Sequence, residues 1–121
     1  MYNKKSILKD NSFQFSLRII SLYKILSTEQ KEYVMSKQLL RSATSVGANI
    51  REAQNAQSNA DFINKLYISQ KECDESIYWL ELLFHSNYIN KTTFEELEVT
   101  ASKILKMLKS SILTMKQKHN L

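Results

Sequence analysis

Three basic side chains on one predicted helix are the residues in this sequence best suited to binding chemistry. They belong to a stripe of residues spaced three or four apart, which lie on one face of that helix. The stripe comprises Lys37, Arg41, Thr44, Ala48, Arg51 and Asn55. It contains no acid, although Glu52 lies next to it in the sequence. Because the planar guanidinium of arginine matches phosphate oxygens, Lys37, Arg41 and Arg51 are predicted to contact the phosphates of RNA or DNA. The alternative is an ordinary solvated face, since the outer faces of bundle helices are normally charged.

A second stripe, on the next predicted helix, has the composition of a subunit contact. It lies away from the core-facing side of that helix and holds Ile68, Glu72, Glu75, Trp79 and Leu82. Aligned apolar side chains rarely remain in water, and Trp is enriched in interfaces. In such a contact, Glu72 or Glu75 of one chain would face Arg41 or Arg51 of the next, and repetition would close a ring. Alternatively, the stripe covers one end of the bundle or packs against the N-terminal segment.

Catalytic and metal-binding arrangements are missing from the sequence. His85 and His119 have no nucleophile or second ligand nearby at metal-binding spacing. Cys73 falls among apolar positions, where a free cysteine behaves as a small hydrophobe. The carboxylates within residues 72–75 lack the Glu-x-x-His pairs of a di-iron bundle. We therefore expect no enzymatic activity, no metal and no cofactor.

The composition predicts an all-α protein. The 121 residues include one glycine and no proline, which leaves few of the residues that β-turns need, and they suffice for a single domain over residues 1–121. One cysteine cannot form an internal disulfide, and no leader or apolar run of about 20 residues is present. A soluble, cytoplasmic protein that does not enter a membrane is expected.

The positive charge lies in the first half of the chain. Residues 1–58 hold nine Lys and Arg against four Asp and Glu, whereas residues 59–121 hold eight of each. A net charge of +5 suggests an anionic partner only where it is concentrated on one face, so the distribution matters more than the total.

Periodicity and capping residues divide the chain into four helices. The first is expected over residues 12–26, with a wide apolar arc that includes Phe13 and Leu17, and a frayed basic arm over residues 1–11 precedes it. A capping box over residues 27–30 would start the second helix, which runs to about residue 57. Ser58 would cap the third helix, and Thr92 with Glu95 would cap the fourth, which ends before a frayed tail over residues 116–121. Three short connections then predict an antiparallel up-down-up-down four-helix bundle.

The core-facing side of the second helix consists mostly of small residues. It comprises Met35, Leu39, Ser42, Ala43, Val46, Asn49, Ile50, Ala53 and Ala56, with Gly47 beside them. The third helix contributes Ile63, Leu66, Gln70, Cys73, Ile77, Leu80 and Phe84. These two helices are expected to pack closely as a hairpin. Asn49 and Gln70 need partners if they are buried, and we expect them to bond to each other, to backbone or to water.

Residues 41–83 resemble the bacterial four-helix-bundle family known as 23S rRNA intervening-sequence, or ribosomal-protein-like, proteins. The matching positions are Arg41, Ala43, Ser45, Asn49, Ile50, Glu52, Asp61, Phe62, Ile63, Leu66, Tyr67, Ile68 and Glu75, followed by the run over residues 78–83. The sequence departs at Gly47, where many members have proline, and at Ala53, where many have glycine. These residue types are common in helices, and it is their combined spacing that is specific to the family.

The resemblance implies a small cytoplasmic bundle with a basic surface that assembles as a ring, commonly a homopentamer. A related branch of the family serves as the accessory protein of a reverse transcriptase in diversity-generating retroelements, which implies a nucleic-acid and protein-binding adaptor. Two hypotheses follow: a phosphate-binding adaptor for RNA or DNA, or a protein-interaction scaffold whose basic stripe is used between subunits.

Overall fold

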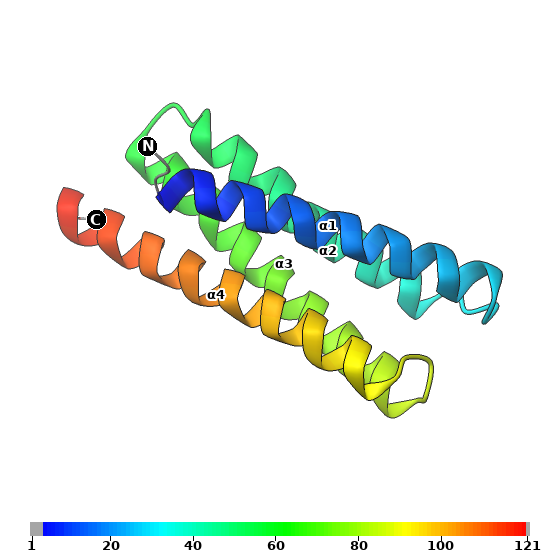
Figure 1. Ribbon diagram of the computed structural model, residues 1–121. Coiled ribbons are helices and arrows are strands. Elements are labelled where there is room, and N and C mark those ends of the chain that lie inside the picture. Colours follow the sequence, from blue (N-terminus) through cyan, green and yellow to red (C-terminus); the bar gives the residue numbers. More distant parts are fainter. Residues whose placement is uncertain (1–3, 121) are drawn as a thin grey trace.

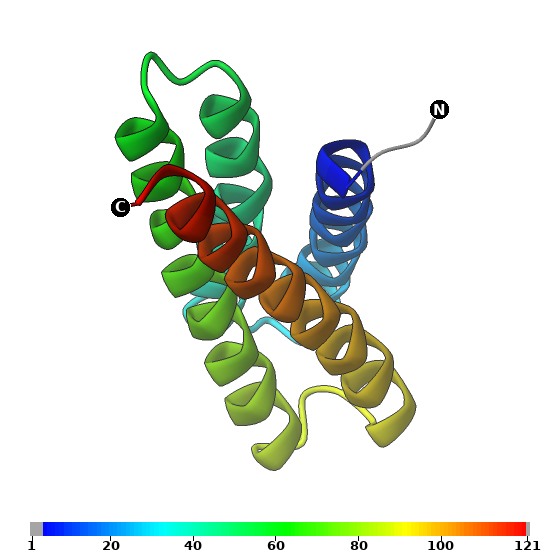
Figure 2. The ribbon, with the colours of Figure 1, turned by 90° about the vertical axis from the view of Figure 1, so that its left-hand side faces the viewer.

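Four antiparallel helices form the protein, as shown by a computed structural model that describes residues 4–120, with side chains from residue 7 onward (Figure 1). They are α1 (Lys4–Thr28), α2 (Met35–Gln54), α3 (Asn59–His85) and α4 (Lys91–His119). Helix α1 packs against α2 and α4, and α3 packs against the same two helices, an arrangement seen from the end that carries both termini in Figure 2. No strand occurs in this part of the chain, and the predicted up-down-up-down bundle is confirmed.

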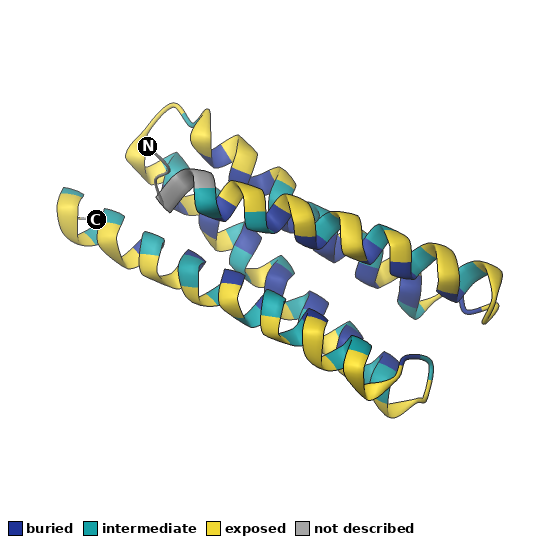
Figure 3. Cartoon of the chain, in the orientation of Figure 1, coloured by how far each residue is buried: buried dark blue, intermediate teal, exposed yellow. Residues whose placement is uncertain are grey.

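Each helix carries a stripe of buried residues on the side that faces the other helices, and the residues on its opposite side are exposed (Figure 3). In α1 the buried positions step by four and three, namely Leu8, Ser12, Phe15, Ile19, Leu22 and Leu26. The predicted wide apolar arc is wrong, because Phe13 is 50% exposed and Leu17 is 43% exposed. Helix α1 also begins at Lys4, and so the predicted start at Ser12 is too late.

The early start of α1 follows from Leu8, which lies one heptad before Phe15 and is 4% exposed in the core. Burial of Leu8 gives the first two turns of α1 a packing surface, which an isolated helix end lacks. At the other terminus α4 continues to His119, so the predicted frayed tail is helical as far as that residue. Residues 1–3 and Leu121, which the sequence also assigned to frayed ends, lie outside the described residues.

The connection between α1 and α2 is built on Glu32, not on the predicted capping box at residues 27–30. The hydroxyls of Ser27 and Thr28 donate to the carbonyls of Tyr23 and Lys24 at 2.8 and 2.6 Å, so both residues complete α1 instead of starting α2. The Glu32 carboxylate accepts hydrogen bonds from three backbone N–H groups at the start of α2. Their donors are Val34, Met35 and Ser36, at 3.1, 3.1 and 2.7 Å.

Glu32 is 8% exposed, and burial by itself would raise its pKa. The backbone donors of Ser36, Met35 and Val34 outweigh burial and hold the pKa of Glu32 below its usual value. A lowered pKa in the folded state means that this carboxylate stabilises the protein above its ordinary pKa, and that the contribution is lost as the pH falls through the folded-state value.

Replacing Glu32 with alanine is therefore expected to lower the free energy of unfolding by about 1–2 kcal/mol at neutral pH, since a helix start loses its acceptor. Urea unfolding of both proteins as a function of pH measures this. The difference in the free energy of unfolding between the two proteins should shrink as the pH is lowered below the ordinary pKa of glutamate. The exposed Glu29, in the same connection, provides the control, and an equal loss for Glu29→Ala would contradict the assignment.

The other two connections also differ in part from the sequence prediction. Ser58 accepts from the N–H of Asp61 at 3.0 Å, which confirms the predicted cap of α3. Helix α4 starts two residues earlier than Thr92 predicts, because Asn90 accepts from the N–H of Thr93 at 2.8 Å. Left-handed backbone occurs at Lys31 (φ 55°) and Asn87 (φ 68°), so the chain makes these turns without glycine.

Small hydroxyl side chains hold α2 close to α3, as the composition of α2 predicts. Ser42 and Ser76 are fully buried with their hydroxyls 2.9 Å apart, and Ser69 donates to the carbonyl of Val46 at 2.8 Å. Asn49 donates to the carbonyl of Ser45 at 2.9 Å, so its predicted use of a backbone partner is confirmed. Within the described residues no buried side-chain nitrogen or oxygen lacks a partner.

Candidate nucleic-acid interface

The structure places the three predicted phosphate-binding residues on the exposed outer face of α2 but gives them different surroundings. Arg41 reaches across to α3, where its Nη1 lies 3.1 Å from Glu72 Oε2 and its Nη2 contacts Glu75 Oε2. These two carboxylates offset the charge of the guanidinium and each engage one of its terminal nitrogens. Arg41 is thus a bridge between two helices of one chain, and it is the least available of the three residues for a phosphate.

The predicted subunit stripe meets the basic stripe on this side of the bundle. Trp79 donates from Nε1 to the same Glu75 oxygen at 3.2 Å, and its ring packs against the core. Arg41 is therefore paired with Glu72 and Glu75 of its own chain, whereas the predicted pairing was between neighbouring chains. Ile68 and Leu82, the apolar ends of the stripe, are half-buried, as are the three residues between them. The intrachain contacts account for Trp79, and they leave the subunit contact a prediction.

Lys37 and Arg51, the other two candidates, lie at opposite ends of α2. Their fourteen-residue separation corresponds to about 21 Å along a helix. Both are exposed, and neither forms an ion pair with another described residue. Because Arg41 is neutralised between them, the three residues do not form one continuous phosphate-binding strip.

Arg51 instead lies beside a groove of about 450 Å³ between α1 and α2. The groove is lined by Lys9, Ser12, Phe13 and Ser16 of α1 and by Thr44, Gly47, Ala48, Arg51 and Glu52 of α2. The helices run antiparallel: Ser16 donates to the carbonyl of Ala43 at 3.4 Å, and Ser12 lies beside Gly47. One turn further along, Lys9 and Arg51 therefore come from opposite walls of the groove.

The charge in this groove is positive and available. Lys9 and Arg51 are exposed and have no carboxylate partner among residues 4–120. The one acid in the lining, Glu52, is paired with Lys65 of α3 at 3.2 Å. An arginine fork and an ammonium on facing walls suit one phosphate group, because both donate charge-assisted hydrogen bonds.

The floor and one edge of the groove are apolar. An added Cβ at Gly47 would meet Ser12 and Ser16 at 3.5–3.6 Å, an ordinary contact, so close helix packing alone does not require glycine here. With Ala48 next to it, Gly47 leaves the floor open. Phe13 stands at the edge with half of its surface exposed, although it lies only two residues from the fully buried Phe15.

Sequence reasoning missed Lys9 and Phe13 as site residues. Lys9 fell in the segment expected to be frayed, and Phe13 was assigned to an apolar arc of the core. The signal was present, because Leu8, Ser12 and Phe15 continue the four-and-three spacing of the buried stripe. Extending α1 through that stripe would have put Lys9 on the helix and Phe13 outside the core.

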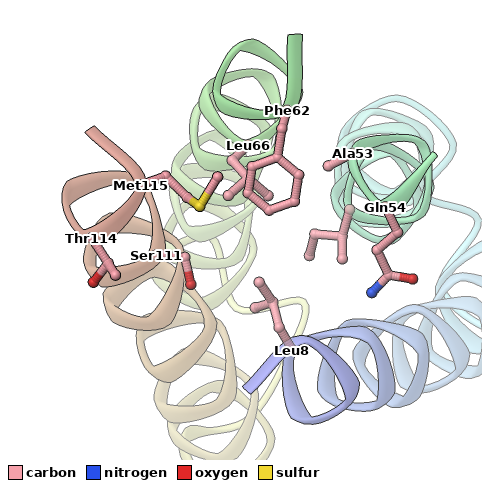
Figure 4. Close-up of a pocket in the computed structure, with 9 residues that line it drawn as sticks. Leu8, Ala53, Gln54, Phe62, Leu66, Ser111, Thr114 and Met115 are labelled. Carbon is pink, nitrogen blue, oxygen red and sulfur yellow. The ribbon is translucent and has the colours of Figure 1, made fainter. Parts of the chain in front are cut away.

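A second cavity, of about 180 Å³, lies inside the same end of the bundle (Figure 4). Leu8 of α1, Phe62 of α3 and Met115 of α4 surround it, together with Ile50, Ala53 and Leu66. Gln54, Ser111 and Thr114 also line it, but no cation does, so it offers a phosphate no charge-assisted contact. The groove on the outer side of α1 and α2 is the better candidate for binding an anion.

Candidate reactive groups are inert or isolated. Burial, and secondarily the charge of Asp74, raise the pKa of the Cys73 thiol to about 12, and its Sγ donates to the carbonyl of Ala101 at 3.2 Å. Within the described residues, no three His, Cys, Asp or Glu side chains gather closely enough to hold a metal ion. None of the helices over residues 4–120 is long and apolar enough to cross a membrane.

Comparison with known proteins identifies the family. The profile of the 23S rRNA-intervening sequence proteins matches residues 4–110, so the chain belongs to this family. A crystal structure of a protein of unknown function from the S23 ribosomal protein family of Bacteroides thetaiotaomicron VPI-5482 is 55% identical, with a TM-score of 0.90. The similarity covers 91% of this chain and 98% of that one. No curated protein matches the sequence.

Proposed function

We propose that this protein is a non-catalytic, ring-forming bundle that binds RNA or DNA through phosphate contacts. The observation that carries the proposal is the pair of unneutralised cations, Lys9 and Arg51, on facing walls of the groove between α1 and α2. The concentration of the positive charge in residues 1–58, which contain both helices, supports it. Lys37, at the far end of α2, would add a peripheral phosphate contact.

Salt dependence provides the test, because phosphate contacts release condensed counterions and weaken steeply as salt rises. Fluorescence anisotropy with a structured RNA and a DNA duplex, each at about 50 and 200 mM salt, measures it. We expect binding of both nucleic acids at the lower salt and a large loss at the higher salt. Absence of salt-sensitive binding would contradict the proposal.

A second candidate function is a protein-interaction scaffold, and the exposed apolar pair Phe13 and Leu17 favours it. These residues lie one turn apart on α1 and are half-exposed, which is the character of a contact surface. The assembly expected from the family resemblance, a ring such as a homopentamer, and the reverse transcriptase partner both remain predictions. Native mass spectrometry of the full chain tests assembly, and a single-chain mass at micromolar concentration would contradict the ring.

A further inference from the structure

We infer that the groove between α1 and α2 takes one unpaired nucleotide of a single strand, with its phosphate between Lys9 and Arg51 and its base on the ring of Phe13. The inference rests on the proposed function and names the form of nucleic acid that the groove recognises. It depends on three features: the register of the two helices, the exposed aromatic ring, and the small residues of the floor.

The register of the helices puts both cations at the same end of the groove. Ser16 and Ser12 lie opposite Ala43 and Gly47, as their contacts show. One turn closer to the start of α1 lies Lys9, on one wall of the groove. One turn closer to the end of α2 lies Arg51, on the other wall. A single phosphate at this end can therefore accept hydrogen bonds from both side chains.

Phe13 comes four residues after Lys9, which is about 6 Å along the α1 axis. A nucleotide likewise carries its base at one end and its phosphate at the other. Phe13 is half-exposed and lines the groove, so part of its side chain is available to an aromatic partner. Base–aromatic stacking is tolerant of sequence, because every base has a π-face.

The floor and the volume of the groove also suit a nucleotide. Gly47 and Ala48 leave an apolar floor, and the volume of about 450 Å³ falls within the ~300–1,000 Å³ typical of small-ligand pockets. A base paired within a duplex is stacked between its neighbours and cannot lie on a protein side chain. A base on Phe13 must therefore be unpaired, as in loops and single strands, where most sequence-tolerant stacking sites act.

The test compares one short, unstructured, fluorescein-labelled RNA with the same RNA annealed to its complement, by anisotropy at low salt. The variants are Phe13→Leu, which keeps the apolar bulk but removes the flat ring, and Phe13→Tyr, which keeps the ring. We expect Phe13→Leu to weaken single-strand binding about tenfold while leaving duplex binding unchanged, and Phe13→Tyr to bind like the natural protein. Circular dichroism and thermal melting show that each variant is folded.

Three results would overturn the inference. An unchanged single-strand affinity for Phe13→Leu, with salt-sensitive binding intact, would remove the stacking site and leave the proposed function standing. Displacement of the RNA by uridine monophosphate at equal nucleotide concentration would reassign the groove to a free nucleotide. Absence of salt-sensitive binding to either RNA by the natural protein would remove the proposed function as well.

Discussion

Replacing Phe15 with alanine is expected to lower the free energy of unfolding by about 3–5 kcal/mol. Phe15 is fully buried, in the middle of the α1 stripe that packs into the bundle. The substitution removes the transfer free energy of the ring and leaves a cavity that the neighbouring side chains fill only in part. Within the described residues α1 packs against α2 and α4, so its attachment depends on a few such side chains. Urea unfolding measures the change.

Phe13 provides the matched control for this prediction, because it is the same residue type in the same helix, two positions away. Half of its surface is exposed, so Phe13→Ala should change the free energy of unfolding by no more than about 0.5 kcal/mol. Equal losses for the two variants would mean that Phe13 is covered in the folded protein, as it would be in a subunit contact. The pair of variants therefore tests both the core of α1 and the availability of the groove edge.

Replacing Lys9 and Arg51 together with glutamine is expected to weaken binding to single-stranded RNA on the order of 30-fold at low salt, from ~1 kcal/mol for each lost phosphate contact. The slope of the logarithm of the binding constant against the logarithm of salt concentration should also fall, by about 1 for each side chain. Both residues are exposed and unpaired within the described chain, so the fold should be unaffected. Anisotropy titrations at several salt concentrations measure both quantities.

The control for this double variant is Lys106→Gln with Lys109→Gln, which removes the same net charge from α4. Both lysines are exposed, and α4 does not line the groove. A site-specific contact predicts a much smaller effect for the α4 pair, because it changes only the long-range field. Equal weakening by the two double variants would show that the RNA responds to net charge and not to the groove.

The architecture was predictable from the sequence because it depends on repeated signals. The small residues of α2 recur over many turns. On α3 the predicted stripe is only partly right, because Ser69, Ser76 and Leu83 are buried and the expected Gln70, Ile77 and Phe84 are only partly buried. These shifts to neighbouring positions leave the helix and its packing partners unchanged. Helix ends depend on single side chains, and there the prediction failed: α4 is capped by Asn90 and not by Thr92, and the start of α2 is held by Glu32. Glu32 holds the start of α2 from two residues before Val34, and no local rule for Ser, Thr, Asp or Asn caps would select it.

The candidate site was less predictable because it depends on which helices are neighbours. Arg41 has the spacing of a phosphate-binding stripe, but its long side chain reaches Glu72 and Glu75 on α3. Arg51 has the same spacing and remains unpaired, since its neighbour Glu52 is occupied by Lys65. The partner of Arg51 across the groove is Lys9 of α1. The predicted start of this helix, at Ser12, left Lys9 outside it. A periodic stripe in the sequence identifies one face of a helix. A binding site also depends on which helix packs beside that face.

Photocrosslinking of a short single-stranded RNA that contains 4-thiouridine tests the central claim most directly, because mass spectrometry then reports which peptides touch the RNA. The two walls of the groove fall in different tryptic peptides, residues 10–18 with Phe13 and residues 42–51 with Gly47 and Ala48. Crosslinks to both peptides are the predicted result. The Lys9→Gln, Arg51→Gln protein lacks these two cleavage sites, so its corresponding peptides are residues 6–18 and 42–65, and their crosslinks should be lost. Crosslinks confined to α3 and α4 would contradict binding in the groove between α1 and α2.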